Sequence, residues 1–573
     1  MAEDKKISGQ FPILPLIAVG ALLASTALLS TCTLERYPTE DTGLGSYVAA
    51  QNASNIGEPG RALGFFIDAL EKDPGNEVIL EKAFNLALKE GEFTHALRFA
   101  EELATGGSEV SNAQMLLALD NLVAGDYEAM QRALEGATGP GYDSLVTPLA
   151  RAWARAAAGE VEEAFAALRA LSAVAAFRPL QQTHAAYILD YAGRAPEAEV
   201  AYERILADNQ IVSAHPVVAY GVMLQKQGRE DKAAEIYERY LDIFPNSEAL
   251  KEAAHMLQQG IVTTSRAASP EAALAGIMIM LSGQLAGDGA LQASVAFGRF
   301  GMFLDPGQSD GLLLLGNIFI ALEEPAAALR VLRTIAMDDP RYVSGLIRQS
   351  FALDDMERID EAFDLMRDYL AGHGENGSVR AALGDLHRIQ SQFEDAARDY
   401  TLAIEAPVDS KATDWFVYFT RAISYDELDL WNLAEADFLK ALELEKDQPD
   451  VLNYLGYSWI DRGMHIEEAR YLIERAAEQR PNDGAITDSL GWVQYLRGDY
   501  ENAVINLERA VELEPGDPVI NDHLGDVYWV VGREMEARFQ WSHALSLDPD
   551  DELLAALKEK LVSGLIVISA NKD

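Results

Sequence analysis

Small residues recur along most of the chain at a nearly constant spacing. Ala62, Ala96, Met130, Ala164 and Ala198 follow one another at steps of 34 residues, and Met130 is the one large member. Four residues after most members of the series comes a large apolar side chain, which places the pair on one face of a helix. The pattern predicts repeated amphipathic helices, and self-similarity at this period is typical of a solenoid.

The series is interrupted once and then continues almost to the C-terminus. A second small residue lies twelve residues before most members, and prolines close many of the units. This order predicts a helix, a tight turn, a second helix and a stop in each unit. The further members of the series are Ala233, Ser294, Ala328, Ala362, Ala396, Ala434, Ala469, Ala503 and Ala537.

The two most complete units, 484–517 and 518–551, resemble the tetratricopeptide-repeat (TPR) family. In that family small residues let the two helices of a hairpin approach, and a large residue fills the gap to the next hairpin. The resemblance implies an all-α superhelical solenoid of about fourteen helix-turn-helix repeats over residues 46–551. The matching residues are Gly491, Gly498, Ala503, Leu507, Ala510 and Pro515, then Gly525, Tyr528, Gly532, Ala537, Trp541, Ala544 and Pro549.

One long step divides the repeat region. Ala233 and Ser294 are 61 residues apart, so we expect an N-terminal TPR half at 46–260, an irregular junction with a long or extra helix at 261–290, and a C-terminal TPR half at 291–551. The apolar run GIMIML in the junction is too short to span a membrane, and we expect it in the core.

The last part of the chain, residues 552–573, does not continue the repeat. The stretch ELLAALKEKLV has apolar residues at helical spacing and is expected to cap the exposed end of the solenoid. The final GLIVISANKD is apolar and β-branched in its first part. It either folds back on the last repeat or stays available to a partner.

The N-terminal 32 residues differ from the rest of the chain. Residues 11–31 carry no charge and are long enough to cross a hydrocarbon core of about 30 Å as a helix. Lys5 and Lys6 precede them, so residues 1–32 resemble a signal peptide or a membrane anchor. Residues 33–45, with Thr, Glu, Pro and Gly, are expected to form a flexible tether.

Cys32 is the only cysteine, so the chain can form no intramolecular disulfide. The tetrapeptide LSTC at 29–32 resembles the lipobox of bacterial lipoproteins, which implies lipidation of Cys32 and a solenoid that faces the periplasm. The residue after the cysteine is Thr33 and not the aspartate that retains lipoproteins in the inner membrane, so the outer membrane is favoured. Thr31 and the acidic residues near the N-terminus depart from the lipoprotein pattern, and an uncleaved inner-membrane signal anchor is the alternative.

The composition restricts the partners. Lys and Arg number 46 against 91 Asp and Glu, which gives a net charge of −45 and argues against nucleic acid as a partner. Proteins with basic or aromatic and apolar segments remain compatible with this charge. No phosphate-binding, dinucleotide-binding or zinc-protease motif occurs, and the nine histidines are scattered. We therefore expect no cofactor, no metal and no catalytic site.

The first helices of the last three repeats offer a candidate groove. Their groove-facing positions alternate aromatic and acidic side chains, which suits a partner with apolar anchors and Lys or Arg. The alternative is that Trp492 and Trp529 pack between helices. The candidate residues are Asn453, Tyr457, Asp488, Trp492, Tyr495, Asp522, Asp526 and Trp529.

Taken together, the anchor, the acidic charge and the C-terminal repeats resemble proteobacterial envelope TPR lipoproteins that act as adaptors of a periplasmic C-terminal processing protease. The resemblance implies a non-catalytic, membrane-tethered scaffold that binds other envelope proteins through the groove of the solenoid and delivers substrates to a protease. A structural subunit of a secretion, polysaccharide-export or envelope-assembly complex is the alternative.

Overall fold

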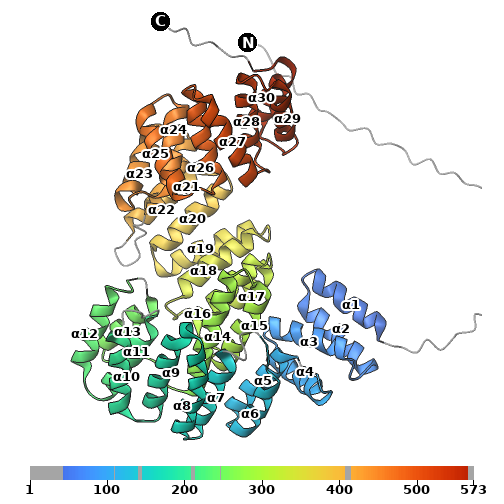
Figure 1. The fold of residues 1–573 in the computed structure, drawn as a ribbon, viewed down its shortest axis with the longest axis vertical. Helices are drawn as coiled ribbons and strands as arrows, with labels where there is room; N and C mark the ends of the chain where they lie inside the picture. The colour runs from blue at the N-terminus through green and yellow to red at the C-terminus, as the bar shows by residue number, and fades with distance from the viewer. Residues whose placement is uncertain are drawn as a thin grey trace, which may run out of the picture.

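The computed structural model describes residues 43–565, apart from 109, 140–144, 208–212, 246 and 407–414. Within these ranges the chain forms 30 α-helices and no β-strand, which confirms the expected all-α class (Figure 1). Residues 11–31 and Cys32 lie outside the described residues. In the part of the chain that is described, no helix combines the length and the apolar character needed to cross a membrane.

Thirteen helices precede the expected junction. They are α1 (Leu44–Asn55), α2 (Pro59–Lys72), α3 (Glu77–Glu90), α4 (Phe93–Thr105), α5 (Ser111–Val123), α6 (Tyr127–Gly136), α7 (Thr147–Ala157), α8 (Val161–Leu168), α9 (Arg178–Tyr191), α10 (Ala195–Ala207), α11 (His215–Lys226), α12 (Glu230–Leu241) and α13 (Glu248–Gln258). Helix α1 therefore begins within the last two residues of the expected tether.

The remaining helices run from the junction to the C-terminal end. They are α14 (Pro270–Gly287), α15 (Leu291–Leu304), α16 (Ser309–Ala321), α17 (Pro325–Leu332), α18 (Tyr342–Asp354), α19 (Ile359–His373), α20 (Gly377–Ile389), α21 (Phe393–Glu405), α22 (Trp415–Glu427), α23 (Trp431–Leu444), α24 (Pro449–Asp461), α25 (Ile466–Gln479), α26 (Gly484–Leu496), α27 (Tyr500–Leu513), α28 (Pro518–Val530), α29 (Glu534–Leu545) and α30 (Asp551–Ser563).

Successive helices pack as hairpins, from α1–α2 to α11–α12 and from α14–α15 to α28–α29, with α13 and α30 outside the pairs. Local chemistry sets their limits. The Asp517 carboxylate accepts hydrogen bonds from the backbone N–H groups that begin α28, which satisfies donors that a helix start leaves free. The hairpin turns need a left-handed residue, which is Gly498 at φ 79° in one repeat and Glu357 at φ 59° in another.

Small residues lie where the two helices of a hairpin cross. A Cβ atom added at Gly491 on α26 would lie 2.6 Å from Cγ of Leu507 on α27. One added at Gly525 on α28 would overlap the indole of Trp541 on α29. The repeated small residue is therefore required by the close approach of the paired helices, as the sequence pattern predicted.

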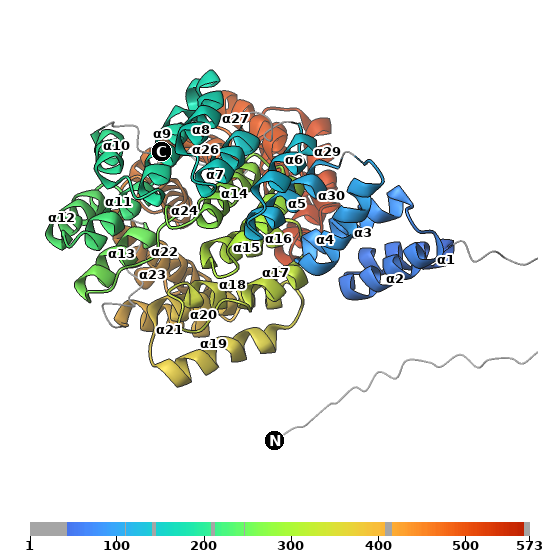
Figure 2. The same cartoon turned by 90° about the horizontal axis from the view of Figure 1, so that it is seen from below.

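The unpaired helix α13 ends just before the expected junction at 261–290. The junction contains one long helix, α14, which has 18 residues and is apolar on all sides. Such a helix needs burial all round. It packs against α5 and α7, and its partner α15 packs against α3 and α5. Figure 2 shows α14 and α15 inside the arc of the N-terminal hairpins, so they fill its concave side.

Polar contacts join the start of the N-terminal half to the helices after the junction. Arg299 on α15 donates from Nε to the carbonyl oxygen of Lys89 at the end of α3, at 2.7 Å. Arg330 on α17 pairs with Glu90 at 2.6 Å. Gly91 has φ 77°, and a Cβ atom there would lie 2.9 Å from the Arg299 guanidinium. These contacts hold the C-terminal end of α3 against α15 and α17.

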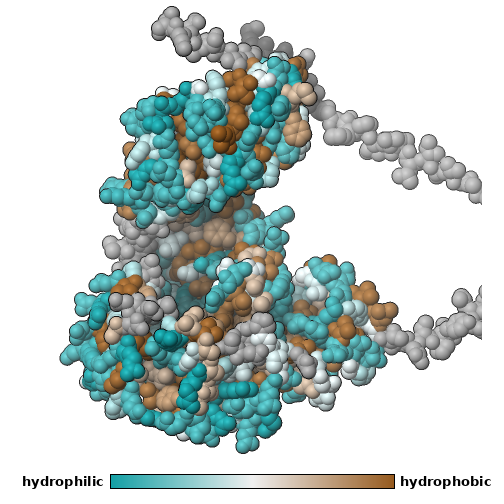
Figure 3. Space-filling model, viewed as in Figure 1, coloured by the Kyte–Doolittle hydropathy of each residue, from teal (hydrophilic) through white to brown (hydrophobic). Residues whose placement is uncertain are grey.

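The C-terminal half continues from α16 to α30 as a second curved arm. Its first helices contact each other in succession, α18 with α20, α20 with α22, α24 with α26 and α26 with α28. Figure 3 shows a recess between the lobe of α23–α30 and the lobe of α5–α13, with hydrophobic and hydrophilic residues inside it. The expected groove residues belong to this arm, on α24, α26 and α28.

Candidate protein-binding groove

The expected groove residues lie on three neighbouring first helices. Asn453 and Tyr457 belong to α24, which packs against α26, and α26 packs against α28. The candidate residues therefore lie in one row of neighbouring helices. Asp488, Trp492 and Tyr495 belong to α26, and Asp522, Asp526 and Trp529 belong to α28.

Trp492 and Asp488 both contact His523, a residue of α28 that the sequence analysis did not single out. The Trp492 ring stacks on the His523 ring with centroids 3.9 Å apart. Nδ1 of His523 lies 2.9 Å from a carboxylate oxygen of Asp488, and both side chains are buried. Burial opposes a charge on the imidazole, but the carboxylates of Asp488, Asp522 and Asp526 together outweigh it, so the pKa of His523 is raised. Trp492, Asp488 and His523 therefore join α26 to α28.

Asp522 and Asp526 face the capping helix α30. Nζ of Lys560 lies 2.7 Å from Oδ2 of Asp522 and 2.9 Å from Oδ2 of Asp526, and both carboxylates are buried. Trp541 donates from Nε1 to Asp526 at 3.0 Å. Burial and the neighbouring Asp522 raise the pKa of Asp526 to about 6, although Lys560 acts in the opposite direction. The acidic residues of the last repeat therefore bind the capping helix α30.

Trp529 is enclosed by α29 and by the end of α30. Its ring centroid lies 5.4 Å from that of Trp541, and the Arg538 guanidinium lies 5.2 Å from it. A Cβ atom added at Gly564, directly after α30, would overlap the Trp529 indole. Arg538 also donates to the carbonyl oxygen of Leu561. Trp529 therefore packs between helices, which is the alternative that the sequence left open.

Three aromatic side chains of the row nearer the middle of the arm are partly exposed. Tyr457, Trp492 and Tyr495 are half-buried. Burial and then Asp488 raise the pKa of Tyr457 to about 12, and burial and then Asp526 raise that of Tyr495 to about 12. Oδ1 of Asn453 is buried without a hydrogen-bond partner among the described residues. The three aromatic side chains are the part of the row that a partner can reach.

Lys560 and His523 are the residues that the sequence reasoning missed. A lysine in a capping helix has no fixed place relative to the groove until the helix is docked, so spacing could not assign it. A signal did exist for Asp522 and Asp526, since two acids one turn apart on a helix face need a nearby cation when they are buried.

A family model described as tetratricopeptide repeat matches residues 183–248 and 464–518. The first matched segment runs from within α9 to the start of α13, and the second covers α25–α27. At these two places the chain contains tetratricopeptide-repeat segments.

Proteins similar to this chain include a TPR repeat-containing protein of Pseudomonas aeruginosa, 26% identical over 189 residues. The match covers 33% of this chain and 32% of that relative, so it spans about a third of the relative's length. Two solved structures are also similar. The APC/C hetero-tetramer Cut9–Hcn1 has a TM-score of 0.39 and 16% identity over 86% of this chain and 96% of that chain. A TPR protein from Parabacteroides merdae has a TM-score of 0.36 and 16% identity over 44% and 97%.

Proposed function

We propose that this TPR protein is a membrane-tethered scaffold or adaptor of the bacterial cell envelope. TPR solenoids generally bind other proteins, because their curved arrays offer extended concave surfaces. They are generally not catalytic. The observation that supports the proposal is which concave surface stays open. Helices α14 and α15 cover the inner helices of the N-terminal half, and α30 covers the end of the C-terminal half, whereas the face of α24 and α26 is left partly exposed.

The binding surface of this proposal is the face of α24 and α26 around Tyr457, Trp492 and Tyr495. Half-buried aromatic side chains supply apolar contact area at a small cost in conformational entropy. The net charge of −45 favours partners with Lys and Arg around an apolar or aromatic anchor.

The tether of this proposal is the N-terminal segment. The uncharged residues 11–31, followed by Cys32 as the only cysteine, support an outer-membrane lipoprotein that faces the periplasm. An uncleaved inner-membrane signal anchor is the second form of the tether. In both forms the TPR arms reach proteins of the envelope from a fixed surface, which raises the effective concentration of those partners.

The finer role is delivery of substrates to a periplasmic C-terminal processing protease. It is supported by the sequence resemblance to envelope adaptors, and the alternative is a structural subunit of a secretion, polysaccharide-export or assembly complex. These roles differ in the stoichiometry of their partners. An adaptor binds a protease and changing substrates, whereas a structural subunit stays with fixed membrane partners.

Site-specific photocrosslinking in intact cells tests the scaffold proposal. A benzophenone amino acid is placed at Tyr457 or Tyr495, and at Phe539, which is 68% exposed on α29, as the control. Adducts at the two groove positions and none at Phe539 are expected. Equal labelling at all three positions, or labelling at Phe539 alone, would contradict the proposed surface.

The identity of the crosslinked proteins separates the two roles. A protease together with several of its substrates supports delivery, which stimulation of that protease by the purified protein then confirms. A constant set of membrane subunits supports the structural role instead.

A further inference from the structure

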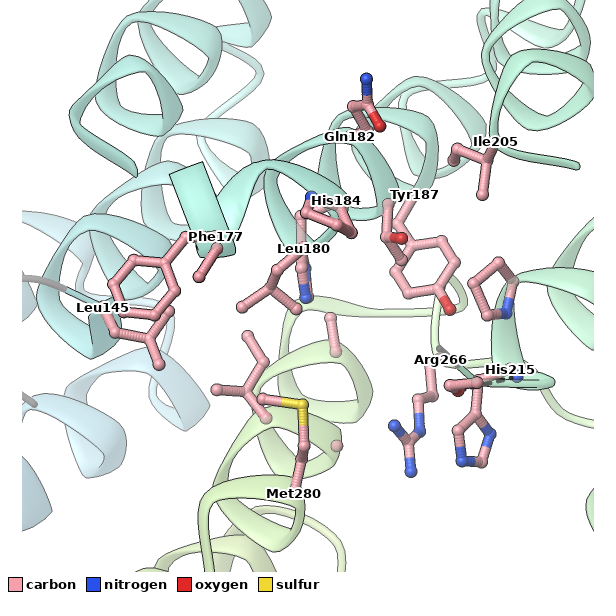
Figure 4. A pocket seen from close by; sticks show the side chains of 18 of the residues that line it. Leu145, Phe177, Leu180, Gln182, His184, Tyr187, Ile205, His215, Arg266 and Met280 are labelled. Atoms are coloured by element: carbon pink, nitrogen blue, oxygen red, sulfur yellow. Dashed lines mark hydrogen bonds between the residues drawn. The ribbon is translucent and has the colours of Figure 1, made fainter. Parts of the chain in front are cut away.

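A cavity of about 280 Å³ lies between α9, the start of α11 and α14 (Figure 4). It is separate from the groove of the C-terminal half. One wall is α14, the helix that fills the N-terminal arc, and the opposite wall is α9. Arg266, in the segment that precedes α14, also lines the cavity. The cavity therefore lies inside the contact between the N-terminal hairpins and the helix that they surround.

The cavity has an apolar part and a polar part. Figure 4 shows Leu145, Phe177 and Leu180 toward one side, with Met280 reaching in from α14. Toward the other side the same view shows Tyr187, Arg266 and His215, with the Tyr187 hydroxyl directed toward Arg266. A ligand with one polar end and one apolar end fits this division.

Arg266 is the only Lys or Arg among the described residues that line the cavity. Its side chain packs on Gly276 of α14, where an added Cβ atom would lie 2.8 Å from Cδ and Nε. Burial lowers the pKa of Arg266, although Tyr187 and Asp310 favour its charged form, and the guanidinium donates no hydrogen bond to a described side chain. A partly buried guanidinium without an acceptor is costly, and a bound anion would remove that cost.

The nearest acidic side chain that acts on Arg266 is already engaged. Asp310 accepts hydrogen bonds from the Arg341 guanidinium at 2.6 and 3.1 Å. Arg341 also pairs with Glu252 at 2.9 Å. Asp310 and Glu252 both pair with Arg341, outside the cavity, and Arg266 is the one side chain with a formal charge among the described residues of the lining.

The two histidines of the cavity are neutral at physiological pH. Burial and then Arg266 lower the pKa of His184 to about 3, and burial, Arg266 and Arg341 lower the pKa of His215 to about 3. Trp153 donates from Nε1 to Nδ1 of His184 at 3.0 Å, so the neutral His184 ring carries its proton on Nε2. The site therefore offers one cation and neutral donors, which suits a single negative charge.

We propose that this cavity binds a medium-chain aliphatic carboxylate, with the carboxylate on Arg266 and the hydrocarbon chain between α9 and α14. A planar carboxylate matches the guanidinium in a bidentate geometry. Leu180, Phe177 and Met280 take the chain. The ligand would lie between the N-terminal hairpins and α14, so its binding stabilises the closed N-terminal half.

Photoaffinity labelling of the full-length protein in lipid nanodiscs tests the site. The probe is octanoate with a diazirine at the end of its chain, and mass spectrometry locates the adduct. Adducts on the α9 and α14 segments are expected, with competition by octanoate and not by octanol or octylamine. From butanoate to octanoate, the competing affinity rises roughly fourfold for each added methylene.

Three variants separate recognition from folding. Arg266→Gln should reduce the specific labelling at least tenfold, since it removes the charge-assisted contact. Met280→Trp should abolish it by filling the cavity, because Met280 reaches into the cavity from α14 (Figure 4). Arg169→Gln is the control, because Arg169 is exposed and lies outside the lining, and its labelling should match the unmodified protein.

Several outcomes would overturn the proposal. They are labelling that Arg266→Gln leaves unchanged, equal competition by octanol, and the absence of any adduct on α9 and α14. Stronger competition by a short peptide that ends in leucine would assign the cavity to a protein C-terminus and would overturn the fatty-acid assignment.

Discussion

Lys560 on the capping helix α30 places its Nζ atom between Asp522 and Asp526 of α28, at 2.7 and 2.9 Å. The two carboxylates are one helical turn apart and buried, so each would be costly without the lysine. The end of the solenoid is thus closed by an electrostatic contact as well as by apolar packing around Leu557, which is fully buried.

Replacing Lys560 by Met should destabilise the C-terminal repeats by about 3 kcal/mol, because it leaves two buried acids without a cation. Urea denaturation followed by tryptophan fluorescence measures the change. Lys558→Met on the exposed side of the same helix is the control and should stay within about 0.5 kcal/mol of the unmodified protein. Equal effects of the two variants would show that Lys560 does not compensate the acids.

The stability of α26–α30 should increase as the pH falls from about 8 to about 5. The pKa of His523 is raised above its usual value, so its contribution is complete below about pH 6.5 and is lost as the pH rises through the raised value. The pKa of Asp526 is raised to about 6, so the folded form binds the proton more tightly and gains stability as the pH falls through about 6. Both groups act in the same direction.

Hydrogen exchange of the α28–α30 amides, corrected for the intrinsic rate at each pH, measures this dependence. His523→Gln and Asp526→Asn should each weaken it. Exchange protection that is flat across this range, or that rises with pH, would contradict the assignment of the two groups.

Gly491→Ala should destabilise the protein by about 1 to 3 kcal/mol through overpacking against Leu507. Alanine is otherwise the better helix former, so the sign of the change reports the close crossing of α26 and α27. Gly64→Ala inside α2 is the matched control, because Gly64 is an exposed helical residue and a Cβ atom there meets nothing within 4 Å. Thermal denaturation compares the pair, and equal melting temperatures would contradict the close crossing.

The repeats could be predicted from the sequence because their chemistry is local. Gly491 and Leu507, or Gly525 and Trp541, belong to one hairpin and recur at a fixed spacing. The contacts of α14 with α5 and α7 join residues more than a hundred positions apart, and no spacing reports them. Lys560 was missed for the same reason, and the enclosure of Trp529 could be stated in advance only as an alternative.

Glu357→Gly should stabilise the C-terminal half by about 0.5 to 1 kcal/mol. Glu357 is exposed and has φ 59° in the turn between α18 and α19, a conformation that costs a residue with a Cβ atom about 1 kcal/mol. Glu357→Ala keeps that cost and serves as the control. Chemical denaturation measures both variants, and a destabilising glycine would show that the turn is held by the glutamate side chain.

Cys32→Ala should abolish lipidation and leave an unprocessed form in the inner membrane. Intact-mass analysis of the purified protein and membrane fractionation measure the change, with the unmodified chain as the reference. A natural protein whose N-terminus is Met1 would contradict the lipoprotein hypothesis and support the signal anchor.

The position of α14 and α15 has a consequence for the order in which the chain folds. A ribosome releases the inner apolar surface of α3, α5 and α7 long before it has made residues 270–304, which cover that surface. Until then the nascent N-terminal arc exposes a surface that can aggregate or bind a chaperone. Most repeat arrays fold from neighbour to neighbour, whereas this arc becomes complete only when its most distant contacts form.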